Sequence, residues 1–69
     1  MEMIGTIQKR INNSSGYILG EDGKLYLYFL YDFLDNENYP LGTKVLFKNE
    51  EENKILRATY ISKYHGEDK

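Results

Sequence analysis

The sequence predicts an all-β fold, a closed five-stranded antiparallel Greek-key β-barrel, on three observations. Five short segments rich in aromatic and aliphatic residues are separated by clusters of Gly, Asn, Asp and Glu. No stretch shows the pattern of a long helix. The 69 residues include no cysteine and only one histidine, His65, so disulfides or a zinc site cannot supplement the core. A chain this short buries only about 60 % of its unfolded surface, which favours a sheet closed on itself.

Three strands are expected in the first half of the chain: Met3–Lys9, Gly16–Leu19 and Lys24–Tyr31. The turn-forming residues Asn12 to Gly16 end the first of them. Gly20 to Gly23 has the composition of a hairpin turn and joins the second to the third. The third segment is the densest in Tyr, Phe and Leu and is the strongest strand signal.

Alternation along the third strand predicts which side chains enter the core. Leu25, Leu27 and Phe29 fall on one face of the strand. Tyr26, Tyr28 and Leu30 fall on the other. We expect the first set to fill the core and the tyrosines to face outward.

A longer connection separates the third strand from the fourth. Residues Asp32 to Pro40 mix Asp, Asn and Glu with the apolar pair Phe33 and Leu34. This composition suits a short helical turn or loop. We expect its two apolar side chains to plug one end of the barrel.

Two further strands are predicted in the second half, Thr43–Lys48 and Lys54–Ser62. Val45 and Phe47 should point inward, and the acidic run Asn49 to Asn53 should form a solvated turn. The barrel would then span residues 1–62, with a flexible tail at residues 63–69. The number of elements and the long third connection match the Greek-key barrel known as the OB-fold better than an SH3-like barrel.

Composition argues against several functions. No cluster of His, Cys and carboxylates has metal-ligand spacing, and no nucleophile and base are placed together, so neither a cofactor nor catalysis is expected. There is no apolar run of membrane-spanning length and no secretory signal, so we expect a soluble cytoplasmic protein. A net charge of −2 lowers the expectation of binding mainly through phosphates but leaves base stacking open.

Several short pieces, in order, resemble the bacterial cold-shock domain. They are Gly5-Thr6-Ile7, Gly16-Tyr17-Ile18, Glu21-Asp22-Gly23, Leu27-Tyr28-Phe29, Leu41-Gly42-Thr43-Lys44-Val45-Leu46-Phe47 and Ala58-Thr59-Tyr60-Ile61. The resemblance covers about residues 5–61 and implies an OB-fold that binds single-stranded RNA or DNA. It implies no enzyme activity.

The two nucleic-acid motifs of that family are only partly present. The first, usually Lys-Gly-aromatic-Gly-aromatic-Ile, reads Asn13-Ser14-Ser15-Gly16-Tyr17-Ile18 here, and the second, usually Val-Phe-Val-His-aromatic, reads Leu27-Tyr28-Phe29-Leu30-Tyr31. The family's Trp-Phe pair falls near Lys9 and Arg10. The resemblance therefore implies a binding surface made of Lys9, Arg10, Tyr17, Tyr28, Leu30 and Tyr31.

Two functions follow from this divergence. With fewer stacking rings than the family, a domain of this kind would bind single strands weakly, at micromolar or higher dissociation constants, and with low specificity. Alternatively, the loss of Trp and His and the negative charge suggest that the surface now contacts protein. That contact, in a homodimer or with a partner, would use Tyr26, Tyr28 and Leu30.

Overall fold

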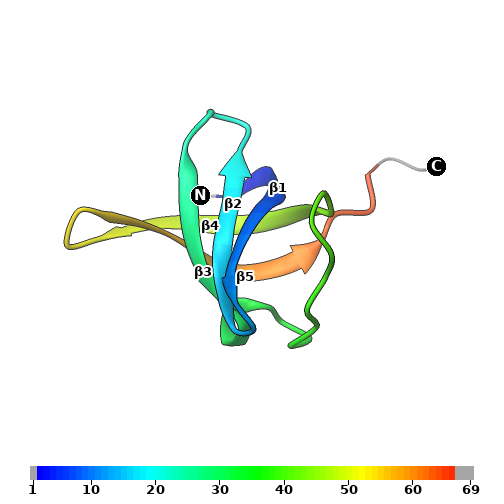
Figure 1. Cartoon of the computed structure of the whole chain (residues 1–69). Helices are drawn as coiled ribbons and strands as arrows, with labels where there is room; N and C mark the ends of the chain where they lie inside the picture. Colours follow the sequence, from blue (N-terminus) through cyan, green and yellow to red (C-terminus); the bar gives the residue numbers. More distant parts are fainter. Residues whose placement is uncertain (1, 67–69) are drawn as a thin grey trace.

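Five strands form one closed barrel in the computed structural model, which describes residues 2–66. They are β1 (Glu2–Asn12), β2 (Ser15–Gly20), β3 (Leu25–Phe29), β4 (Lys44–Glu52) and β5 (Ile55–Lys63), with a 3₁₀ turn, η1 (Leu30–Asp32), after β3. The strand order is β1-β2-β3-β5-β4 (Figure 1). The seams are antiparallel except β3–β5, which is parallel. The predicted all-β barrel is confirmed.

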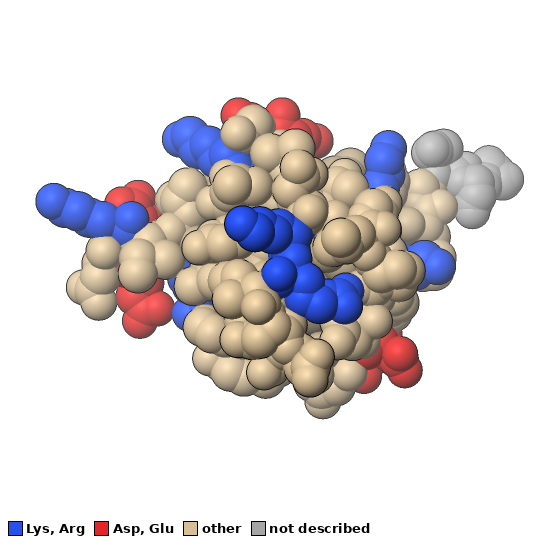
Figure 2. All heavy atoms as spheres, in the orientation of Figure 1, with Lys and Arg blue, Asp and Glu red and all other residues tan. Residues whose placement is uncertain are grey.

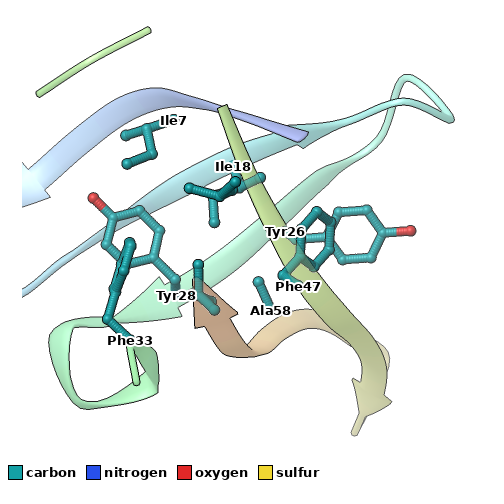
Figure 3. Packing of buried hydrophobic residues seen from close by; sticks show 9 residues of the cluster. Ile7, Ile18, Tyr26, Tyr28, Phe33, Phe47 and Ala58 are labelled. Atoms are coloured by element: carbon teal, nitrogen blue, oxygen red, sulfur yellow. The ribbon is translucent and has the colours of Figure 1, made fainter. Parts of the chain in front are cut away.

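Nine buried side chains fill the barrel: Ile7, Ile18, Tyr26, Tyr28, Phe33, Val45, Phe47, Ala58 and Ile61. Figure 3 shows the ring pairs on opposite sides of Ile18. Tyr28 meets Phe33 edge to face at 5.3 Å between centroids, and Tyr26 lies 5.1 Å from Phe47. The inward directions predicted for Val45 and Phe47 are confirmed, since neither exposes any surface.

The prediction for the faces of β3 is wrong. Tyr26 and Tyr28 are each 2 % exposed, whereas Leu25 is 48 % exposed and Leu27 and Phe29 are half-buried. Aliphatic side chains are fully buried more often than tyrosine, but the interior of this barrel has space for tyrosine rings. The tyrosines occupy that room, and β3 turns its aliphatic face outward.

Glycines on β2, the strand paired with β3, leave the space that the Tyr26 and Tyr28 rings occupy. Gly16 pairs with Tyr28, and a Cβ at Gly16 would lie 2.7 Å from the Tyr28 hydroxyl oxygen. A Cβ at Gly20 would lie 3.0 Å from Cε1 of Tyr26. The Tyr26 hydroxyl reaches the barrel end and donates to Asp22 Oδ2 at 2.6 Å. Burial therefore leaves the polar tip of that ring hydrogen-bonded.

The connection after η1 plugs the barrel with one side chain rather than two. Phe33 is 2 % exposed and belongs to the core, as predicted. Leu34 is 66 % exposed, so its predicted role as a plug is wrong. Phe33 and Ile61 form an isolated parallel bridge, and Leu34 N–H donates to the Ile61 carbonyl at 2.8 Å. These backbone contacts leave the Leu34 side chain outside the barrel.

The acidic run does not form a turn, because β4 continues through Glu52. Glu50, Glu51 and Glu52 pair with Arg57, Leu56 and Ile55 in a hairpin that projects from the barrel (Figure 1, yellow). The turn itself is Asn53–Lys54, where φ is 53° and 67°. Two consecutive positive φ values are typical of the type I′ turn, whose twist matches that of an antiparallel pair.

β5 continues through Lys63, where Val45 is its partner, so pairing passes the predicted barrel boundary at Ser62 by one residue. The Tyr64 N–H also donates to the Lys44 carbonyl at 2.8 Å. Residues 67–69 of the predicted tail lie outside the described residues. Within residues 2–66, no helix is long and apolar enough to cross a bilayer.

Candidate nucleic-acid interface

A row of side chains crosses the outer face of β1, β2 and β3. Lys9 pairs with Tyr17, and Tyr17 pairs with Leu27, so the three are direct cross-strand neighbours. Lys9 is exposed, and Tyr17 and Leu27 are half-buried. Directly opposite residues on one face of a sheet place their Cβ atoms about 5 Å apart. The row therefore combines an ammonium group, an aromatic ring and an aliphatic side chain on one surface.

A stack of three planar groups continues this face beyond the end of β3. The rings of Phe29 and Tyr31 are nearly parallel, at 12°, with centroids 5.4 Å apart. The Arg57 guanidinium carbon lies 4.9 Å from the Phe29 centroid. Tyr31 is 73 % exposed. A half-buried ring thus supports an exposed one, as expected of a rigid platform for an unpaired base.

Asp32 holds this stack in place. Its Oδ2 accepts from the Phe29 backbone N–H and from Arg57 Nη2, each at 2.8 Å. The Asp32 side chain is 8 % exposed and that of Arg57 is 16 % exposed. Burial opposes the charge of Arg57, but the hydrogen bond to Asp32 and the charge of that carboxylate outweigh it and raise the pKa of Arg57. The guanidinium is therefore a permanent support for the Phe29 ring.

Positive charge gathers at the centre of the face despite the net charge of −2. Figure 2 shows Lys and Arg side chains over β1 and β2, with the acidic side chains of that view at its margins. The basic residues of these two strands are Lys9 and Arg10. Arg10 is already engaged, because its Nη2 donates to the Tyr39 carbonyl at 2.6 Å. Lys9 is the more available of the two for a phosphate.

Three of the six predicted site residues form this surface: Lys9, Tyr17 and Tyr31. Tyr28 does not, because its ring is inside the barrel, where burial raises its pKa and the charge of Arg10 opposes the rise. Leu30 is half-buried at the start of η1. The predicted protein-contact patch is also wrong, since Tyr26 and Tyr28 are both buried.

Leu27 and Phe29 were missed because the faces of β3 were assigned in reverse. The observed outward positions of β3 are Leu25, Leu27 and Phe29. The missed signal was Gly16 and Gly20, whose spacing marks the inward face of β2 and the places where large rings of β3 fit. The position of Arg57 beside Phe29 depends on the parallel β3–β5 seam and has no local signal.

The chemistry of the face is that of a binding surface. Aromatic rings offer stacking, Lys9 offers a phosphate contact, and Leu27 offers an apolar contact. Within residues 2–66, no group of three or more His, Asp or Glu side chains is arranged to hold a metal ion.

Comparison with known proteins adds evidence for the fold. No protein-family model and no curated protein sequence matches this chain. A solved structure from Drosophila, of the segment of Unr designated CSD456, is similar with a TM-score of 0.81 and 17 % sequence identity. The similarity covers 100 % of this chain and 29 % of that chain, so this chain spans less than a third of the length of the solved chain it matches. At this identity the likeness shows the fold alone, which is a cold-shock-type OB-fold barrel.

Proposed function

We propose that this chain is a divergent cold-shock domain that binds single-stranded RNA or DNA in the cytoplasm, weakly and with little sequence selectivity. The observation that carries the proposal is the continuous outer surface from Lys9 and Tyr17 to the stacked rings of Phe29 and Tyr31. Similarity to a cold-shock domain structure supports it. The domain would hold strands unpaired and would need neither catalysis nor a cofactor.

The energetics explain why the binding would be weak. Stacking contributes about 1 to 3 kcal/mol per base, and this face offers the rings of Tyr17 and Tyr31, because the Phe29 ring is already stacked between Tyr31 and Arg57. Lys9 adds a phosphate contact, but the acidic β4–β5 hairpin and the net charge of −2 limit the release of counterions. We therefore expect dissociation constants in the micromolar range or above, with only a modest dependence on salt.

The test is an NMR titration of the labelled protein with a heptathymidine strand at low salt. Amide shifts should concentrate at Lys9, Tyr17, Phe29 and Tyr31. Absence of shifts at millimolar oligonucleotide would overturn the proposal.

Variants sharpen this titration. Tyr17→Ala should weaken binding by about 5- to 100-fold, the range that corresponds to one stacked base. Lys9→Ala should weaken it less and reduce the slope of log K against log salt by about one unit. Lys63→Ala is the matched control, because this exposed lysine lies in the β4–β5 seam and not in the row across β1, β2 and β3. Equal losses in all three variants would contradict the assigned face.

A further inference from the structure

A groove of about 410 Å³ begins where the proposed stacking face ends. It is lined by Tyr31, Asp32, Leu34, Glu50, Thr59 and Tyr60. Tyr31 belongs to both surfaces. Phe29 covers one face of its ring, so the exposed part of Tyr31 is the other face and the edge. A strand that stacks along the face would bring its next base to this groove.

The second ring of the groove is held out by a strained backbone. Tyr60 has φ of 51° and is 64 % exposed. It lies at a β-bulge, because the pairs Leu46–Ser62 and Lys48–Thr59 leave Tyr60 and Ile61 together opposite Phe47. A positive φ is unfavourable for an aromatic residue, and core packing does not explain an exposed ring. Bulges often redirect a side chain beside a functional site.

The charges of the groove balance. Asp32 is paired with Arg57, and Lys48 Nζ lies 5.5 Å from the Tyr60 centroid, so two cations accompany the carboxylates of Asp32 and Glu50. This balance disfavours a cationic side chain of a protein partner, which would meet Lys48. Two exposed rings and no net charge suit a neutral planar ligand such as a nucleobase.

Glu50 provides the selective contact. Thr59 Oγ1 lies 3.2 Å from Glu50 Oε2 and 3.3 Å from the Lys48 carbonyl oxygen, so its single proton is shared between two acceptors. The other carboxylate oxygen, Oε1, accepts no hydrogen bond from the described residues. A carboxylate only accepts hydrogen bonds. Guanine presents two adjacent donors, N1–H and N2–H₂, on its Watson–Crick edge, and both can point at one carboxylate. Thymine and uracil present one N–H between two carbonyl oxygens, which a carboxylate repels.

From this geometry we infer that the Tyr31–Tyr60 groove binds one guanine base at the end of the bound strand, with Glu50 as the residue that selects it. This inference rests on the proposed function and adds a base preference at one position to it. The rest of the face does not distinguish one base from another, because it offers rings and an ammonium group but no oriented hydrogen-bond acceptor.

The test compares three strands by NMR titration: heptathymidine, and the same strand with a single guanine at its 5′ or its 3′ end. One of the two guanine strands should bind about fivefold or more tightly than heptathymidine, because a bidentate contact discriminates by at least this factor. Its shifts should extend from Phe29 and Tyr31 to Thr59 and Tyr60.

Two variants and a control identify the groove. Glu50→Gln should abolish the guanine preference without weakening heptathymidine binding, because the amide no longer accepts both guanine donors and no longer repels the thymine carbonyl oxygens. Tyr60→Asn should reduce the guanine preference by removing one ring of the groove, and it should keep the fold, since Asn adopts positive φ readily. Glu51→Gln removes a neighbouring carboxylate that does not line the groove and should keep the preference.

The outcomes separate the inference from the proposed function. If heptathymidine shifts the face and guanine adds nothing, the inference is overturned and the proposed function stands. If neither strand shifts any amide, both are overturned. If an arginine-containing peptide, and not guanine, shifts Tyr60, the groove binds a cationic partner and the inference is overturned.

Discussion

Tyr28 and Tyr31 carry the same side chain three positions apart, yet one is 2 % exposed and the other 73 %. Tyr28 packs edge to face on Phe33 inside the barrel, whereas Tyr31 lies flat on Phe29 outside it. The neighbours of each ring make the difference. Gly16 leaves space for Tyr28, and the end of β3 at Phe29 lets η1 turn Tyr31 outward.

The comparison shows that residue type alone does not separate core rings from binding rings in a small barrel. An aromatic ring buries a large area whether it faces the core or a neighbouring ring. A glycine on the paired strand is a better indicator that a ring is buried, because the missing Cβ leaves a volume that a neighbouring side chain must fill.

The largest expected effect tests the comparison directly. Tyr28→Ala should destabilise the domain by about 3 to 5 kcal/mol, enough to unfold much of so small a protein. Tyr31→Ala should destabilise by no more than about 1.5 kcal/mol, because the ring is exposed and loses only its contact with Phe29. Urea unfolding followed by circular dichroism measures both. Similar unfolding midpoints for the two variants would contradict the assigned inner and outer faces.

The role of the glycine can be tested next. Gly16→Ala should destabilise by about 1 to 3 kcal/mol, because the added methyl group meets the Tyr28 ring and the Lys9 carbonyl. In the background of Tyr28→Leu, Gly16→Ala should cost less, because leucine lacks the ring and the hydroxyl that the methyl group meets, while the contact with the Lys9 carbonyl remains. A double-mutant cycle in urea measures this coupling. If Gly16→Ala is neutral, the glycine does not decide which face of β3 is buried.

A smaller effect is the pH dependence of stability that comes from the hydrogen bond between Tyr26 and Asp22. The hydrogen bonds from the Tyr26 hydroxyl and the Lys24 N–H lower the pKa of Asp22 below its usual 3.8. The ionised Asp22 carboxylate therefore stabilises the folded protein above pH 3.8, which is the pKa of Asp22 in the unfolded chain. This stabilisation is lost as the pH falls through the lower pKa of Asp22 in the folded protein. The urea midpoint should drop on acidification, and Asp22→Asn should reduce that drop.

Glu21→Gln is the matched control for this measurement, since it changes a neighbouring carboxylate of the same turn. It should keep the acid sensitivity of the unmodified protein. An unchanged acid sensitivity in Asp22→Asn would show that the Tyr26–Asp22 hydrogen bond does not contribute.

Much of the architecture could be predicted from local patterns. Turn residues at Asn12 to Gly16 and Gly20 to Gly23 separated the first three strands with bounds correct to within three residues, and Val45 and Phe47 were placed inward correctly. The acidic run was misassigned because charge indicates exposure, and an exposed two-stranded ribbon is as solvated as a turn. The candidate site was half predictable, since Lys9, Tyr17 and Tyr31 lie on the surface as expected, whereas Tyr28 was expected there and is buried.

The sequence by itself determined the number of strands, their approximate bounds and the closed all-β architecture, because turn chemistry and period-two patterning act over a few residues. Only the tertiary structure decided which face of β3 enters the core and which rings meet. Those outcomes depend on volumes contributed by other strands, such as the space beside Gly16. They also depend on the parallel seam that brings Arg57 to Phe29, and such distant pairings leave no trace in a local pattern.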